Sequence, residues 1–285
     1  MSSQTTDYQI AVMSPNELRT AIEWARLEGW NPGLDDADAF YPSDPQGFLV
    51  GKINQQPVAS ISAVRYGSAF AFIGLYIVEK SFRHQGYGIH LWTRALEYLK
   101  GRNIGLDGVL AQQDNYRKSG FTLAHRNIRF AGLAQNNGLI PENIVELSSI
   151  PMDELAAYDR HFFPAPRTSF LQAWIHQTHS HALGIMENNK LVAYGVIRAC
   201  TDGYKIGPLN AESKDLALEL FTALTAKIPS GATVYLDTPE PNSAAIEIAE
   251  RHDMRPCFET ARMYTGAAPD LPLHKIFGIT SFELG

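Results

Sequence analysis

The stretch RHQGYG, residues 83–88, joins an apolar run over 71–78 to an amphipathic run over 89–99. The apolar run has the pattern of a buried strand, and the amphipathic run that of a helix. Glycines in the turn allow backbone conformations that a Cβ would strain, and they let a ligand approach the chain closely. The start of the helix adds unpaired N–H groups and the positive end of its dipole. The sequence therefore predicts a diphosphate-binding turn and a phosphorylated cofactor.

Two common phosphate-binding motifs are absent from this turn. A Walker loop needs Gly-Lys-Ser or Gly-Lys-Thr after its glycines, and a dinucleotide-binding fold needs a third glycine and an acidic residue about 20 positions later. Neither pattern occurs here. Instead, Arg-x-x-Gly-x-Gly after a strand that ends in LYIV (residues 75–78) resembles the coenzyme A loop of the GNAT superfamily of N-acetyltransferases.

A second motif follows in the order that this superfamily has. NYRKSGF (residues 115–121) resembles the Tyr-x-x-x-Gly-Phe that closes a helix at the end of the second cofactor motif. Between the two motifs, NIGLDGVL (residues 103–110) supplies the apolar strand. Strand, loop, helix, strand and tyrosine helix therefore run consecutively with compatible lengths. We expect the acetyltransferase fold for the first half of the chain.

Length and composition indicate two soluble domains. A chain of 285 residues is long for one such domain, and 45% hydrophobic residues supply enough apolar material for two cores. No apolar run reaches the roughly 18 residues of a membrane span, and the start MSSQTTDYQ lacks the regions of a signal peptide, so we expect a cytoplasmic protein. The net charge of −6 without a basic run argues against a nucleic-acid partner. Cys200 and Cys257 are too sparse for a disulfide framework, and we expect both thiols to be reduced and buried.

The same order of elements occurs twice along the chain. The first half is expected to have strands over 8–12, 47–52 and 58–66 and helices over 15–27 and 35–41 ahead of the cofactor strand. For the second half we expect strands over 144–147, 182–187, 191–198, 204–209 and 233–237 and helices over 152–162, 169–179, 216–228 and 243–251. The polar segment AQNNGLIPEN (134–143) separates the predicted domains, 1–135 and 144–285. The fold class is therefore α/β (α+β): two tandem GNAT-like domains, each a mixed, mostly antiparallel sheet flanked by helices.

The second half looks like a degenerate copy of the first. Asp253 and Met254 replace the Gly and Phe of the second motif, Ala249 replaces its tyrosine, and NAESK (210–214) has no loop glycines. We therefore expect only the first half to bind coenzyme A. The whole chain resembles tandem bacterial acetyltransferases with a YitH-type C-terminal half, on the segments YGVIR, YKIGPL and ARMY. The second domain is expected to help shape the acceptor pocket.

The resemblance implies roles for residues of the first half. The backbone of the cofactor strand and the loop amides would hold acetyl-CoA, and the residues concerned are Ile77, Val78, Arg83, His84, Gln85, Gly86, Tyr87 and Gly88. Two roles stay open for Arg83, a phosphate contact or a cap on the strand end. Tyr116 takes the place of the tyrosine that protonates the leaving thiolate, and a phenol with a pKa of about 10 is protonated at neutral pH. Aromatic packing at the end of a helix is the alternative for Tyr116.

The general base is not identified, because the strand segment IGLY (73–76) carries no carboxylate. Asp107 and Glu28 are candidates for this role, and for each a structural role or substrate binding is the alternative. The segment EGWNPG (28–33) combines an acid, an indole and an amide, so Glu28, Trp30, Asn31 and Asp107 form our acceptor-recognition hypothesis. An indole and a carboxylate can hold an ammonium group by cation–π contact and ion pairing, although an indole also commonly covers a core.

These residues predict an N-acetyltransferase that moves an acetyl group from acetyl-CoA to a primary amine of a small molecule. Direct attack is favoured, since neither cysteine lies in the first half. The alternatives are a coenzyme A-responsive regulatory protein and transfer of a longer acyl chain. We expect no metal at His176, His179 and His181, because no cysteine or carboxylate completes a ligand set. Arg198 is expected to face the first domain or the acceptor channel.

Overall fold

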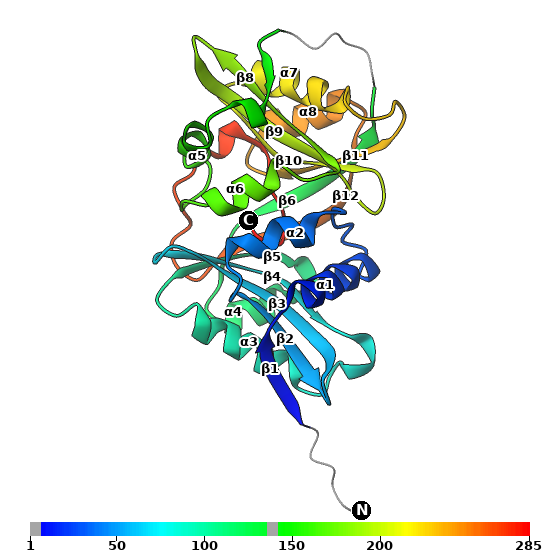
Figure 1. Cartoon of the computed structure of the whole chain (residues 1–285), viewed down its shortest axis with the longest axis vertical. Helices are drawn as coiled ribbons and strands as arrows, with labels where there is room; N and C mark the ends of the chain where they lie inside the picture. Colours follow the sequence, from blue (N-terminus) through cyan, green and yellow to red (C-terminus); the bar gives the residue numbers. More distant parts are fainter. Residues whose placement is uncertain (1–6, 136–141) are drawn as a thin grey trace, which may run out of the picture.

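The computed structural model describes residues 7–135 and 142–285, and its two halves stack end to end (Figure 1). The strands are β1 (Tyr8–Val12), β2 (Phe48–Ile53), β3 (Gln56–Tyr66), β4 (Phe70–Val78), β5 (Asn103–Val109), β6 (Thr122–Leu133), β7 (Ile144–Glu146), β8 (Ser180–Glu187), β9 (Lys190–Ala199), β10 (Tyr204–Ala211), β11 (Thr233–Pro239), β12 (Arg255–Tyr264) and β13 (Ile276–Gly278). The α-helices are α1 (Pro15–Leu27), α2 (Asp36–Phe40), α3 (Tyr87–Tyr98), α4 (Gln113–Lys118), α5 (Met152–Asp159), α6 (Thr168–Trp174), α7 (Lys214–Thr225) and α8 (Ser243–Arg251).

The first helix begins where the sequence predicts. Ser14 accepts a hydrogen bond from the Glu17 amide, and the Glu17 carboxylate accepts one in return from the Ser14 amide, so the pair forms a capping box ahead of Pro15. The amides of Ser14 and Glu17, which have no partner within the helix, are both hydrogen-bonded in this way. At the opposite end of the chain, α8 spans the predicted residues 243–251.

The strands form one continuous, mostly antiparallel sheet, which confirms the predicted α/β fold class. The order is β1-β2-β3-β4-β5-β12-β6-β11-β10-β9-β8-β7, with β13 attached to β10. Only two neighbouring pairs are parallel, β4 with β5 and β10 with β11. These two pairs occupy equivalent places in the two halves, as the repeated element order leads one to expect.

The two halves exchange strands at their junction. β12 comes from the second half of the sequence, yet it lies between β5 and β6. Its Arg262 pairs in register with Asp107 of β5 and with His125 of β6. Residues 122–133 and 255–264 form strands that the sequence patterns do not predict. The domain bounds 1–135 and 144–285 stay a prediction, and residues 136–141 of the predicted linker lie outside the described residues.

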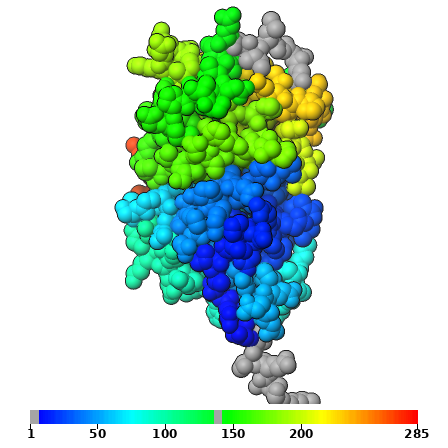
Figure 2. All heavy atoms as spheres, viewed as in Figure 1, coloured from blue at the N-terminus to red at the C-terminus, as the bar shows by residue number. Residues whose placement is uncertain are grey.

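A large core lies between the halves. It combines side chains from α1, α2 and β4 with side chains from α5, α6 and β9, and the rings of Phe40 and Trp174 stack across it at 5.8 Å. Separate cores lie under α3 in the first half and under α7 and α8 in the second. Figure 2 shows the blue N-terminal elements packed directly against the green second half on the face in view. The halves therefore share an apolar interior.

Three local predictions for the second half are wrong. α6 ends at Trp174 rather than at 179, because the chain from Ser180 onward pairs with β9. α5 ends at Asp159 rather than at 162, where Arg167 folds back to form a buried ion pair with the Asp159 carboxylate (2.7 Å). Cys257 is exposed, while Cys200 is buried as expected. No helix in the described part of the chain is both long and apolar enough to cross a bilayer.

Candidate active site

A groove opens where the two parallel strands of the first half separate. β4 and β5 pair only from Phe70 and Asn103 to Ile73 and Leu106. Just beyond, Leu75 has a left-handed φ of 47°, and its carbonyl accepts a hydrogen bond from Ser60 Oγ at 2.8 Å. The bulge turns β4 away from β5, so within the described residues its edge facing β5 is left without a strand partner.

The far part of this open edge carries the predicted cofactor-binding residues Ile77 and Val78. Both follow the bulge, and Ile77 pairs on its other side with Ser60 of β3. This part of the edge therefore has no strand partner on the groove side among the described residues, although the Val78 carbonyl accepts a hydrogen bond from Arg83 Nε. Such an edge can hydrogen-bond to an extended ligand arm as it would to another strand.

The turn over residues 83–88 has the geometry of an anion site. His84 and Gly86 have left-handed φ values of 62° and 88°, and α3 begins directly afterwards at Tyr87. No side chain caps this helix, and among the described residues none accepts a hydrogen bond from the amides of 84–88. The free amides and the helix dipole together suit a phosphate group.

Gly88 sets the distance between α3 and the cofactor strand. A Cβ at this position would lie 2.7 Å from Tyr76 Oη and 3.0 Å from Val78 Cγ2. A larger residue at this position would require the Tyr76 side chain or the helix to shift. The open edge of β4 and the start of α3 therefore lie against each other and can hold two parts of one ligand.

Arg83 caps the strand end, which is one of the two roles left open for it. Its Nε donates to the Val78 carbonyl at 2.8 Å, and its Nη2 donates to Glu28 Oε1 at 2.6 Å. The Arg83 and Glu28 side chains keep 35% and 25% of their surface exposed, so both remain within reach of a ligand. A phosphate contact by Arg83 and an acceptor contact by Glu28 stay predictions.

Tyr116 lies over the β5 side of the groove. Its ring covers Gly108 so closely that a Cβ there would overlap it, and it packs 5.6 Å from the Trp92 ring. Burial, followed by the neighbouring Tyr76 hydroxyl, raises the pKa of Tyr116 to about 12. The Tyr116 hydroxyl makes no hydrogen bond to any residue that the structure describes. A protonated, unengaged phenol is suited to donate a proton to a ligand in the groove.

Asp107 holds two strands together instead of facing the groove. Its carboxylate accepts hydrogen bonds from Arg262 at 2.6 and 2.8 Å and from Asn127 Nδ2 at 2.8 Å. The side chain is fully buried, and burial raises its pKa although Arg262 opposes the shift. The exchange of β12 into the first half creates this arrangement, because Asp107 and Arg262 are register partners. The geometry gives the expected substrate contact of Asp107 no support.

The segment after Glu28 is bound to the second half. Asn31 Nδ2 donates to the Asp202 carbonyl at 2.8 Å, and Asn31 Oδ1 accepts from the Asp202 amide at 2.9 Å. The Trp30 side chain is half-buried against the shared core, and its carbonyl accepts from Arg129 at 3.0 Å. The Asn31 amide is therefore engaged away from any acceptor, and the acceptor role of Trp30 stays a prediction.

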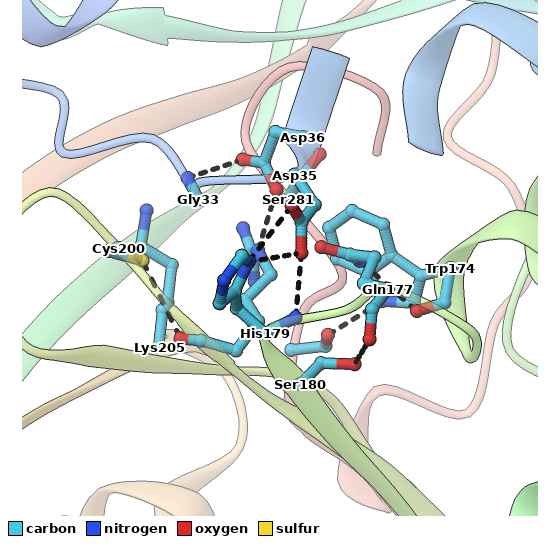
Figure 3. Close-up of polar contacts among 12 residues, drawn as sticks. Gly33, Asp35, Asp36, Trp174, Gln177, His179, Ser180, Cys200, Lys205 and Ser281 are labelled. Atoms are coloured by element: carbon cyan, nitrogen blue, oxygen red, sulfur yellow. Dashed lines mark hydrogen bonds and ion pairs between the residues drawn. The ribbon is translucent and has the colours of Figure 1, made fainter. Parts of the chain in front are cut away.

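Charged side chains continue this contact between the halves. Arg198 lies against Asp36 (2.9 Å), both almost fully buried, which bears out the prediction that Arg198 faces the first half. His179 Nδ1 contacts the Asp35 carboxylate at 3.1 Å, and the His179 amide donates to the same group, as Figure 3 shows. His179 lies outside α6, so it does not share a helix face with His176 as the sequence suggests. In the described ranges, no group of three or more His, Cys, Asp or Glu side chains is arranged to hold a metal ion.

The equivalent groove of the second half is filled. β10 and β11 pair in parallel only up to Ile206 and Leu236, after which β13 lies against β10 and the Ile279 amide donates to the Asp237 carbonyl at 2.9 Å. The start of α7 is also occupied, because Ser213 Oγ accepts from the Leu216 amide. The second half has neither an open strand edge nor an uncapped helix at this place.

Comparison with known proteins finds a GNAT match in each half of the chain. Residues 16–121 match the acetyltransferase (GNAT) family, and residues 155–278 match an acetyltransferase (GNAT) domain. The chain is 33% identical over 272 residues to the holothin acyltransferase of Pseudoalteromonas sp. (strain SANK 73390), covering 95% of this chain and 92% of that protein. The chain belongs to the GNAT family of acyltransferases. Its two GNAT domains follow in tandem.

Solved structures share the fold of this GNAT protein. A candidate acetyltransferase from Pyrococcus horikoshii superposes with a TM-score of 0.82 at 21% identity, covering 100% of this chain and 98% of that one. A tandem GNAT protein from the clavulanic acid biosynthesis pathway superposes with a TM-score of 0.62 at 13% identity, covering 92% and 100%. The YitH-type character of the second half stays a prediction.

Proposed function

We propose that this GNAT protein transfers an acetyl group from acetyl-CoA to a primary amine of a small molecule. The observation that carries the proposal is the open edge of β4 beside an uncapped α3, since the equivalent groove of the second half is filled by β13. Members of the family use acyl-CoA, so one such molecule per chain is expected, bound by the first half.

The residues of the first half fit the parts of this ligand. The free amides of 84–88 would receive the diphosphate, and the open backbone at Ile77 and Val78 would receive the pantetheine arm. The bound thioester supplies an activated acetyl group. Tyr116 would stand beside its sulfur and give up its hydroxyl proton to the departing thiolate.

Direct attack by the amine is supported by the places of the cysteines. Cys200 directly follows β9, and Cys257 is the third residue of β12. Burial raises the pKa of both thiols, so neither is an activated nucleophile. A ternary complex of chain, acetyl-CoA and amine therefore requires no acyl-cysteine intermediate.

The kind of acceptor is proposed from the relative. The protein that is 33% identical over nearly the whole chain is named for holothin, so holothin is the first acceptor to test. Its name also says acyltransferase, which keeps transfer of a longer acyl group as a second candidate. A competition series of acyl-CoA thioesters against acetyl-CoA separates the two.

The test is release of free coenzyme A from acetyl-CoA with holothin, amino acids, polyamines, aminosugars, aromatic amines and peptides as acceptors. Tyr116→Phe should lower kcat by about 10²-fold or more, because general acid catalysis contributes at least that much, and should leave acetyl-CoA affinity unchanged. Tyr98→Phe is the matched control. Its hydroxyl donates to Asp44 at the far end of α3, and its pKa is also about 12. That variant should retain turnover.

Two results would contradict the proposal. Equal losses of turnover and acetyl-CoA affinity in Tyr116→Phe would make Tyr116 a binding residue only. Tight binding of acetyl-CoA without turnover of any acceptor or acyl thioester would favour the coenzyme A-responsive regulatory protein, in which the second half receives a partner.

A further inference from the structure

A glutamate from the segment after β13 lies over the cofactor strand at the point where the groove opens. A Cβ at Gly74 would lie 2.7 Å from Glu283 Cα, so the main chain of Glu283 rests directly on β4. Gly74 follows Ile73, the last residue of β4 that pairs with β5. Ser62 Oγ donates to the Glu283 carbonyl at 3.3 Å. The residue is thus placed beside the bulge and not at a distant surface.

Contacts on both sides hold this segment in place. Tyr66 Oη donates to the Leu284 carbonyl at 3.0 Å, and the Leu284 amide donates to Ser281 Oγ at 3.0 Å. The ring of Phe282 lies 4.7 Å below the Arg129 guanidinium. A side chain carried by such a segment has a defined position before any ligand binds, which catalytic groups require.

The Glu283 carboxylate has no hydrogen-bond partner among the described residues, although the residue is only 4% exposed. The charged groups that act on the Glu283 carboxylate are Asp36, Arg129, Arg198 and Lys205. Arg129 pairs with Asp237, and Lys205 Nζ donates to the Asn31 carbonyl at 2.9 Å. Arg198 Nε pairs with Asp36, while its two Nη atoms are buried without a hydrogen bond to any described residue. A buried carboxylate without a hydrogen bond is unfavourable unless a ligand completes it.

This carboxylate supplies what the cofactor strand lacks. Residues 73–76 carry no acid, Asp107 is consumed by Arg262, and Glu28 is paired with Arg83. Building on the proposed acetyl transfer, we propose that Glu283 is the general base, which takes the proton from the acceptor amine. The second half would thereby contribute a catalytic residue to the groove of the first.

The step balances as a direct transfer. The amine nitrogen forms a bond to the thioester carbonyl carbon, and one of its protons passes to the Glu283 carboxylate. The carbon–sulfur bond then breaks, and the thiolate takes the proton of Tyr116. Glu283 afterwards loses its proton to water, and Tyr116 regains one, so the products are the N-acetylated amine and coenzyme A.

Protonation of Glu283 should switch the step off. Burial raises the pKa of this carboxyl above its usual range, while Lys205, Arg198 and Arg129 oppose that shift and Asp36 adds to it. A protonated carboxyl cannot accept the amine proton, so kcat should fall as the pH drops through the raised pKa of Glu283. Above that pKa the base is fully available.

The experiment compares Glu283→Gln with the whole wild-type chain at saturating acetyl-CoA and saturating acceptor. Glu283→Gln should lower kcat by about 10²-fold or more and remove the acid limb of the kcat–pH profile, with acetyl-CoA affinity unchanged. Asp36→Asn is the matched control, because it removes one negative charge from the same buried cluster. It is expected to lower the melting temperature while keeping the acid limb.

Each alternative outcome decides against the inference. If Glu283→Gln keeps the wild-type kcat–pH profile, or if both variants lose the acid limb, Glu283 is not the base. Its carboxylate would then serve only to balance the three buried cations. If Glu283→Gln does not fold, Glu283→Asp replaces it, and an unchanged kcat in that shortened variant excludes the base. No turnover by the wild type would overturn the proposed function itself, whereas Tyr116-dependent turnover that ignores Glu283 overturns only this inference.

Discussion

At the residue scale, buried ion pairs connect strands and helices that are far apart in the sequence. Arg129 on β6 contacts Asp237 on β11 at 2.6 Å, and Arg262 on β12 contacts Asp107 on β5 at 2.6 Å. Arg129 holds the pKa of the Asp237 carboxyl below its usual range against the opposing effect of burial. Removing one member of such a pair leaves the other charge buried without compensation, which strongly lowers the free energy of unfolding.

Asp107→Asn should therefore act on stability and not on acceptor binding. We expect a loss of about 3–5 kcal/mol in the free energy of unfolding, because Arg262 would keep its buried charge. Urea denaturation measures this loss, with Asp114→Asn as control, since that exposed carboxylate pairs only with Arg117 on the surface. A raised KM for the acceptor at unchanged stability would instead restore Asp107 to substrate recognition.

At the element scale, the site depends on how one strand and one helix begin and end. The bulge at Leu75 opens β4, and the left-handed Gly86 starts α3 with its amides free. Both elements are held by neighbours: β4 pairs with β3, and α3 lies close against β4 at Gly88. A substitution in the turn over residues 83–88 should therefore change the affinity for the ligand, in addition to the loss of stability that backbone strain causes.

Gly86→Ala and Gly67→Ala form a matched pair for this prediction. Both glycines have left-handed φ values, 88° and 66°, and a Cβ at either would meet nothing within 4 Å. Each substitution should cost about 1–2 kcal/mol of stability for the left-handed backbone alone. Only Gly86→Ala should weaken acetyl-CoA binding, as measured by titration calorimetry. Equal affinities in the two variants would remove the turn from the cofactor site.

At the scale of the whole molecule, the two GNAT halves have diverged in what occupies the space between their parallel strands. In the second half β13 fills that space, and Asn242 Nδ2 holds it by donating to the Ile276 carbonyl at 2.9 Å. The same segment continues to Glu283 over β4 of the first half. The segment that fills the groove of the second half therefore continues to the groove of the first half.

The expected stoichiometry is one acetyl-CoA per chain, because an extended ligand arm would have to displace β13 to enter the second groove. Equilibrium dialysis or calorimetry with the wild type measures this number, and Gly86→Ala locates the site in the first half. A second equivalent of bound acetyl-CoA would mean that β13 does not exclude it.

The sequence by itself determined the glycine turn before α3, the helix that carries Tyr116 and most element positions. These features are local: a glycine's left-handed φ, an uncapped helix start and the period of apolar residues depend on neighbours a few positions away. The sequence also indicated that the second half is a degenerate copy, because the absence of the loop glycines and of the tyrosine can be seen without a structure.

Only the tertiary structure decided which strands meet. The exchange of β12 and the place of Glu283 join residues more than 120 positions apart, and the filling of the second groove by β13 joins residues more than 60 positions apart. Nothing in a local pattern specifies such partners. The sequence alone favours acceptor contacts for Asp107 and Asn31, because no local pattern shows that they have other partners. These partners, Arg262 and Asp202, lie in the other half of the chain. Packing of the shared core, the pairing of β12 with β5 and the buried ion pairs together select those partners, because they bring the two halves into register.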